Sequence, residues 1–197
     1  MNETVLVTGV TGTVGSEVVK QLSKVGPNYN VKAGVHSIKN AKKIQQYDRV
    51  KPVQIDYDKL KGHETAFKDV DMLFLLTHPS PKTVEHESNL ITEAKKSGIK
   101  HIVKQSIMGA DLGADVEAMR LHRQAEKLIE ESGIPYTFLR PNEFMQGSIN
   151  FQGHTIKSDS AFYIPAGNFE RVVTDHLQSS LCSILVSTKE PKIIPKE

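Results

Sequence analysis

The amino-acid sequence predicts an α/β fold in which helices cover a doubly wound parallel sheet. Two observations carry this prediction: short β-branched runs alternate with helix-spaced apolar residues, and a glycine-rich turn joins the first run to the first helix. The length of 197 residues, with 38% hydrophobic and 24% charged residues, suits one globular domain. Right-handed crossovers then place any ligand at the carboxyl ends of the strands.

The elements follow from local patterns. The expected strands share a short apolar run bounded by turn residues, and they cover residues 4–8, 31–35, 53–55, 72–76, 99–105 and 136–139. The expected helices share apolar residues three to four positions apart, and they cover residues 14–25, 63–67, 84–96 and 118–132, with one further helical run at 175–186. The five residues at 72–76 are all apolar, which is typical of a parallel strand covered on both faces.

Composition excludes several classes of function. Twenty-five Lys and Arg residues against 23 Asp and Glu residues leave a net charge of +2, so no overall field favours direct binding of nucleic acid. The apolar runs are far shorter than the roughly 20 residues that cross a bilayer, so we expect no membrane span. Glu3 stands where a signal peptide has basic residues, and the single cysteine, Cys182, fits a reducing compartment. We therefore expect a cytoplasmic protein.

The turn at residues 8–15, with the sequence TGVTGTVG, is the strongest chemical signal. Gly9 permits a tight turn, Gly12 lets backbone N–H groups approach a pyrophosphate, and Gly15 allows the helix to pack closely on the sheet. A glycine turn can also join a strand to a helix for structural reasons alone, but here the spacing, the strand and the helix agree. The predicted dinucleotide-binding residues of this turn are Gly9, Thr11, Gly12, Thr13, Val14 and Gly15.

The end of the second strand favours NADP over NAD. An acidic residue there would bind the ribose 2′-hydroxyl of NAD and repel a 2′-phosphate. This chain instead has His36, Ser37 and Lys39, with Lys42 and Lys43 one turn further on. These groups could hold a phosphate, although the alternative is a solvated basic helix start.

Two later strand ends complete the expected cofactor edge. Asp56 and Tyr57 follow the third strand, where a carboxylate can accept a hydrogen bond from the adenine amine; the alternative is that Asp56 caps a turn. Thr77 and His78 follow the fourth strand and are expected to line the path of the ribose and nicotinamide.

Three further segments, KQSIMGAD at 104–111, LHRQAE at 121–126 and EESGIPYTFLRP at 130–141, resemble the NmrA-like group of atypical short-chain dehydrogenases. That group includes NADPH-dependent quinone oxidoreductases and is related to isoflavone-reductase-like enzymes. The resemblance implies a Rossmann-type NAD(P)-binding domain at 1–141 and a reduced C-terminal substrate-binding portion at 142–197. Residues 162–168 look like the family segment that begins this portion. The resemblance also implies cofactor contacts by Lys104, Ser106, Pro141 and Phe144.

One departure from the family's wider pattern concerns catalysis. Ordinary short-chain dehydrogenases use a Tyr-x-x-x-Lys pair, in which the lysine lowers the pKa of the tyrosine. Here His122 and Glu126 occupy the corresponding positions, and isoflavone-reductase-like enzymes have a catalytic lysine in the place of His122. An imidazole could donate a proton near neutral pH, and Glu126 is expected to raise its pKa. The alternative is a structural pair on the helix surface.

The leading hypothesis is an NADP(H)-binding oxidoreductase that passes a hydride to a small electrophile such as a quinone or a carbonyl compound. Quinone reduction needs little acid catalysis, which suits the missing Tyr-x-x-x-Lys pair. The chain also ends sooner than family members generally do, which implies an open or reduced substrate pocket. The alternative is a non-enzymatic redox sensor of the NmrA type that docks a regulatory protein or forms a homodimer. A nucleotide-sugar epimerase is disfavoured, because that chemistry normally uses the missing tyrosine and lysine. No metal site is expected.

Overall fold

The computed structural model of the chain describes residues 2–25, 28–41, 44, 46–59, 63–144, 154, 157–158 and 173–174. The predictions for Lys42 and Lys43, for the segment at 162–168 and for the helix at 175–186 lie outside these residues. Most of the predicted portion at 142–197 does so too, and its boundary stays a prediction.

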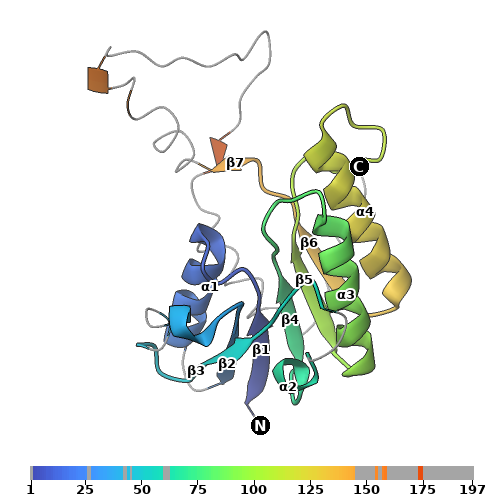
Figure 1. Cartoon of the computed structure of the whole chain (residues 1–197). Helices are drawn as coiled ribbons and strands as arrows, with labels where there is room; N and C mark the ends of the chain where they lie inside the picture. The colour runs from blue at the N-terminus through green and yellow to red at the C-terminus, as the bar shows by residue number, and fades with distance from the viewer. Residues whose placement is uncertain are drawn as a thin grey trace.

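A six-stranded parallel sheet forms the centre of the molecule (Figure 1). Its strands are β1 (Glu3–Val7), β2 (Tyr29–Val35), β3 (Val50–Gln54), β4 (Met72–Leu75), β5 (His101–Gln105) and β6 (Tyr136–Leu139). They follow the order β3-β2-β1-β4-β5-β6, and all neighbouring pairs are parallel. This is the Rossmann strand order, so the predicted fold class is confirmed. The direction of winding reverses between β1 and β4, where such sheets open a crevice at their carboxyl ends.

Helices lie on both faces of the sheet (Figure 1). They are α1 (Thr13–Lys24), the one-turn α2 (Glu64–Phe67), α3 (Thr83–Lys96) and α4 (Glu117–Ser132), with a 3-10 turn η1 at Ile38–Ala41. Alternate residues of β1 belong to two separate apolar clusters: Val5 and Val7 pack with α1, whereas Leu6 packs with α2, α3 and α4. Two cores, one on each face, therefore hold the sheet in place.

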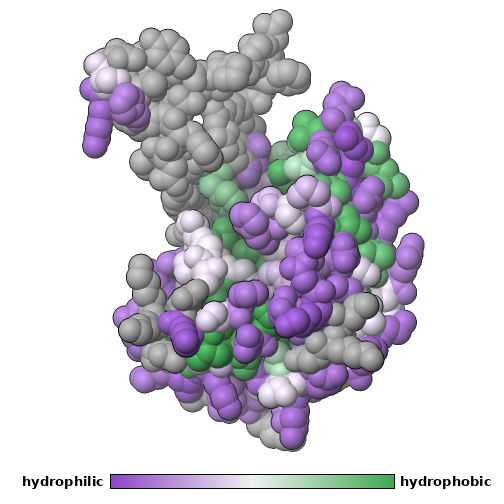
Figure 2. Space-filling model, viewed as in Figure 1, coloured by the Kyte–Doolittle hydropathy of each residue, from purple (hydrophilic) through white to green (hydrophobic). Residues whose placement is uncertain are grey.

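Side-chain pattern explains the helices. The inner side of α3 carries Leu90, Ile91 and Ala94, all buried, and Figure 2 shows that its outer face is hydrophilic. Gly133 ends α4 in the left-handed conformation, at φ +78°, as expected of a C-terminal glycine. Within the described ranges, no helix is both long enough and apolar enough to cross a membrane.

One strand differs clearly from its prediction. We expected the third strand at residues 53–55, but β3 covers Val50–Gln54 and includes Pro52. Proline cannot donate to a sheet ladder and usually marks the end of a strand. In the described sheet β3 is an edge strand that pairs with β2, and an edge position tolerates the missing N–H group. A short second pair, β7 (Glu143–Phe144) and β8 (Val173–Thr174), follows the main sheet in the chain.

Candidate functional site

Packing within the protein requires a glycine at two of the three glycine positions of the turn. Gly9 has φ +64°, and a Cβ atom there would lie 2.8 Å from the Leu76 carbonyl oxygen. A Cβ atom on Gly15 would overlap the carbonyl group of Gly9, so helix and turn can approach only with glycine at this position. At Gly12, by contrast, the backbone is extended and the nearest atom to a Cβ would be the Gly9 oxygen at 3.4 Å. The fold itself does not need a glycine at position 12.

The turn presents the amino-terminal end of α1 to solvent. The helix begins at Thr13, Gly12 supplies no side-chain cap, and the first turn contains no acidic residue. The first N–H groups of a helix have no acceptor within it, and the helix dipole places a partial positive charge there. The Gly12 amide donates to the Gly9 carbonyl at 3.0 Å, so the N–H groups suited to a pyrophosphate are those of the first turn of α1, which begins at the exposed Thr13.

Two side chains hold the turn in place. The buried hydroxyl of Thr8 donates to the Leu76 carbonyl at 2.8 Å and accepts from the Leu76 amide at 2.8 Å, which ties the end of β1 to the end of β4. The hydroxyl of Tyr57 accepts a hydrogen bond from the Gly9 amide at 3.1 Å, and burial raises the pKa of Tyr57. Tyr57, predicted near the adenine, thus supports the glycine turn.

Asp56 makes the turn contacts that were its predicted alternative role. Its carboxylate accepts from the Asp58 amide at 3.3 Å and lies 3.0 Å from the ammonium of Lys59. The Lys59 ammonium, together with the Asp58 amide, holds the pKa of Asp56 below its usual range. A contact between Asp56 and adenine stays a prediction.

The end of β2 lies at the same edge as the glycine turn, because β1 and β2 are adjacent and parallel. His36 and Lys39 are exposed and Ser37 is half-buried. The side-chain amide of Gln54 donates to the His36 carbonyl at 3.2 Å and so connects this end to β3. The structure brings the predicted 2′-phosphate residues together with the predicted pyrophosphate turn.

Two predicted cofactor residues meet inside the protein. Lys104 is completely buried, and its ammonium lies 2.8 Å from Glu87 Oε1 and 2.9 Å from the Gln105 carbonyl. The hydroxyl of Thr77 donates to the same Glu87 oxygen at 2.8 Å. The cofactor contact predicted for Lys104 stays a prediction. Lys104 fixes Glu87, which in turn orients Thr77 at the exit of β4.

Glu126 joins α4 to the ends of β5 and β6. It is completely buried and accepts hydrogen bonds from Ser106 at 2.7 Å, from Arg140 Nε at 2.8 Å and from Arg123 at 3.1 Å. Burial opposes its ionisation, but bonds from Arg140, Ser106 and Arg123 outweigh burial and hold the pKa of Glu126 below its usual range. Glu126 therefore makes the contacts of a structural residue, its catalytic role stays a prediction, and Ser106, predicted to touch the cofactor, donates a hydrogen bond to it.

His122 differs from its prediction in the direction of its pKa. Burial lowers the pKa of His122 and the Lys104 ammonium lowers it further, whereas Glu87 and Glu126 act weakly in the opposite direction. Glu126 raises this pKa, as expected, but burial and the Lys104 ammonium outweigh it, so the net direction is downward. Among the described residues, three buried side-chain atoms have no hydrogen-bond partner: His122 Nδ1, Glu87 Oε2 and Gln105 Oε1. Buried polar atoms are normally satisfied, so these three are exceptions in the interior around Lys104 and His122.

The remaining predicted residues lie along the same strand ends. His78 is exposed after β4, the carbonyl of buried Pro141 accepts from the Met108 amide at 2.8 Å, and Phe144 lies half-buried in β7. Sequence reasoning missed Glu87, Arg123 and Arg140. A signal for Glu87 exists, since it shares the apolar spacing of Leu90, Ile91 and Ala94 on α3, where an acidic residue needs a buried partner.

The strand order, the glycine turn and the basic end of β2 together define a dinucleotide-binding Rossmann domain. Comparison with known proteins agrees: a family model described as NAD(P)H-binding matches residues 9–176, and the chain belongs to this family. Its relatives include an NmrA-like family domain-containing oxidoreductase of Aspergillus flavus, which is 26% identical over 149 residues and confirms the resemblance found in the sequence.

Three relatives illustrate the similarity. The NAD(P)H azoreductase of Xenophilus azovorans is 32% identical over 166 residues, which are 83% of this chain and 56% of that protein. The Escherichia coli NADPH-dependent quinone oxidoreductase QOR2, solved with NADPH, has 25% identity and a TM-score of 0.72 over 79% of this chain and 54% of its own. The Citrobacter sp. triphenylmethane reductase, solved with NADP(H), shares the fold, with 24% identity and a TM-score of 0.82 over 93% of this chain and 66% of its own. The chain spans about half the length of the curated relatives it matches.

Proposed function

We propose that the protein binds NADP(H) and transfers a hydride from the nicotinamide to a small electrophile of the quinone or carbonyl class. The observation that carries this proposal is the exposed amino-terminal end of α1 at Gly12, beside the switch point between β1 and β4. A glycine that the fold does not need is best explained by close approach of a ligand. Azoreductase and quinone oxidoreductase relatives support the reductase class.

Preference for NADP over NAD rests on the end of β2. His36, Ser37 and Lys39 supply hydrogen-bond donors and positive charge, and this strand end carries no acidic residue. The nearby carboxylate of Asp56 lies 3.0 Å from the Lys59 ammonium, and this pairing supports the proposal because Lys59 competes with a ribose hydroxyl for that carboxylate.

The bound nicotinamide would supply the hydride, and the chain's own residues would position the reactants. Thr8 and Tyr57 hold the pyrophosphate turn, and Thr77 is oriented by Glu87 at the end of β4. His122, with its lowered pKa, is a neutral hydrogen-bonding group at neutral pH. Such a site suits an acceptor like a quinone, whose reduction needs little side-chain acid catalysis.

The test is oxidation of NADPH by the full chain across a panel of quinones, azo compounds and aldehydes, followed at 340 nm, a wavelength at which reduced nicotinamide absorbs. We expect turnover above the uncatalysed background with at least one class of acceptor. Tight NADPH binding without turnover across the whole panel would contradict the enzymatic proposal.

A redox sensor is the second candidate, and one observation favours it. Among the residues that the structure describes, Glu126 is locked by arginines and His122 has a lowered pKa, so the site offers no strong proton donor at neutral pH. In that case the nucleotide-bound form would dock a regulatory protein or a second copy of the chain. A change in oligomeric state between NADP⁺ and NADPH, measured by sedimentation velocity, would support this candidate.

A further inference from the structure

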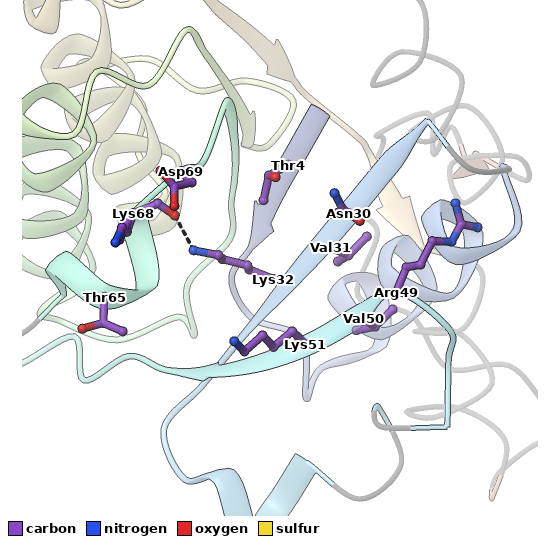
Figure 3. Close-up of a pocket in the computed structure, with 10 residues that line it drawn as sticks. All are labelled: Thr4, Asn30, Val31, Lys32, Arg49, Val50, Lys51, Thr65, Lys68 and Asp69. Carbon is purple, nitrogen blue, oxygen red and sulfur yellow. Dashed lines mark hydrogen bonds between the residues drawn. The ribbon is translucent and has the colours of Figure 1, made fainter. Parts of the chain in front are cut away.

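An open pocket lies at the opposite end of the sheet from the glycine turn (Figure 3). Residues at the starts of β2 and β3 and residues of α2 and its end line this pocket, and its volume is about 530 Å³. Its lining includes Asn30 and Lys32 from the first half of β2 and Thr65 from α2. We call it the basic pocket because four basic residues, Lys32, Arg49, Lys51 and Lys68, line it together with one acidic residue, Asp69. Pockets of this size hold small molecules.

The lysines create an excess of positive charge. Lys32 and Lys51 stand directly opposite each other in the β2–β3 register, an arrangement that is unfavourable for like charges. Burial lowers the pKa of Lys32, Lys51 and Lys68 lower it further, and Asp69 acts in the opposite direction. Among the described residues, none of the three lysines forms an ion pair with a carboxylate. With Arg49, four basic residues therefore line the pocket together with one acidic residue.

One of the three lysines is held in place by hydrogen bonds. Figure 3 shows Lys32 extending across the hollow to the end of α2, where its ammonium donates to the Lys68 carbonyl and, at 3.3 Å, to the Ala66 carbonyl. A lysine stem can simply cover an open sheet face, and this explains the position of Lys32. It does not explain the exposed Lys51 and Lys68, which add charge to the same hollow.

We propose that the basic pocket binds a small anion that carries phosphate groups, at a site separate from the glycine turn. The anchored ammonium of Lys32 supplies a fixed positive charge, and Lys51 and Lys68 close on the ligand from β3 and from the end of α2. Ammonium groups bind phosphate as compact point charges, and the Thr65 hydroxyl adds a hydrogen-bond donor. The ligand also relieves the repulsion between Lys32 and Lys51.

The probe is inorganic pyrophosphate, titrated calorimetrically into the full chain saturated with NADP⁺, so that the glycine turn is occupied. We expect one binding site per chain. Lys51→Gln and Lys68→Gln should each weaken this binding about three- to tenfold, which corresponds to the loss of one charge-assisted contact. Both side chains are exposed, so the fold should be unaffected. Lys127→Gln removes the same charge from the exposed side of α4 and should leave the affinity unchanged.

The Gly12→Val variant separates this proposal from the proposed function. Pyrophosphate binding should persist in that variant even where NADP⁺ binding is lost. Absence of binding, an equal loss in Lys127→Gln, or loss in Gly12→Val with no effect of Lys51→Gln would each overturn the basic pocket as a phosphate site. Equal affinity for a short polyglutamate peptide would also overturn it, because the attraction would then be general to acidic chains.

Discussion

The buried ion pair between Lys104 and Glu87 leads to a quantitative stability prediction. Lys104→Met keeps an apolar stem of similar length but removes the ammonium that lies 2.8 Å from the Glu87 carboxylate. Both side chains are about 1% exposed, so Glu87 would be left as a buried charge with Thr77 as its partner. Breaking a buried pair from one side costs about 3–5 kcal/mol. A loss of that size is a large share of the roughly 5–15 kcal/mol that stabilise a typical domain.

The assay is urea unfolding of the full chain, followed by circular dichroism. The double variant Lys104→Met/Glu87→Met removes both charges and should recover most of the lost free energy of unfolding, apart from about 1 kcal/mol for the Thr77 hydroxyl. Lys100→Met is the matched control, because it removes an ammonium from the exposed pair with Asp71 and should cost little.

Two results would refute this reasoning. If Lys104→Met unfolds at the same urea concentration as Lys100→Met, the pair is not enclosed in the way the structure shows. If the double variant is no more stable than Lys104→Met alone, the cost does not come from an uncompensated Glu87.

Three further predictions concern the candidate site. Lys39→Glu should reduce the preference for NADPH over NADH, measured by titration calorimetry, and the preference of the parent protein should shrink in high salt. An unaltered preference in Lys39→Glu would show that Lys39 is merely solvated. If His122 donates a proton, the reduction rate should fall as pH rises through the pKa of His122. That pKa lies below the usual range of histidine because burial and Lys104 lower it, and His122→Gln should abolish the pH dependence. Tyr57→Phe leaves the Gly9 amide without its acceptor, so we expect a loss of about 1 kcal/mol in urea unfolding and weaker NADPH binding; full affinity would mean that the turn holds itself.

The histidine also links stability to pH. A buried histidine with a lowered pKa binds protons more readily when the chain is unfolded, so His122 and His101 should make the free energy of unfolding decrease as pH falls below the usual range of histidine. Urea unfolding at several pH values checks this. His101 lies in β5, and its Nε2 atom forms a hydrogen bond of 3.0 Å with the Thr137 hydroxyl. A stability that rises toward acid pH would contradict the direction of both shifts.

The fold could be predicted because its signals are local. The glycine turn, the apolar run of β4 and the left-handed Gly133 after α4 each depend on residues close in sequence, and β6 was predicted at its observed bounds, Tyr136–Leu139. The start of β3 was missed because Pro52 is unfavourable for a strand in general, and its tolerance depends on an edge position that only the assembled sheet defines.

The site was predictable only in part, for a physical reason. The turn glycines belong to one continuous motif, whereas the Lys104–Glu87 pair joins residues 17 positions apart and the Arg140–Glu126 pair joins residues 14 apart. The i,i+4 spacing on the predicted helix indicated that Glu126 lies beside His122. It did not indicate that Arg140 forms an ion pair with the Glu126 carboxylate. Which carboxylate meets which cation depends on how α3 and α4 pack against β5 and β6.

The central claim is that Gly12 lies against a bound pyrophosphate, and NADPH affinity of the Gly12→Val variant tests it most directly. A Cβ atom at Gly12 would meet its nearest described neighbour at 3.4 Å, and the extended backbone there suits valine, so the variant should fold. Gly113→Val is the matched control, since its Cβ atom would also meet its nearest described neighbour at 3.4 Å. Calorimetric titration should show NADPH binding lost in Gly12→Val and retained in Gly113→Val. Unchanged NADPH affinity in a folded Gly12→Val protein would contradict the account.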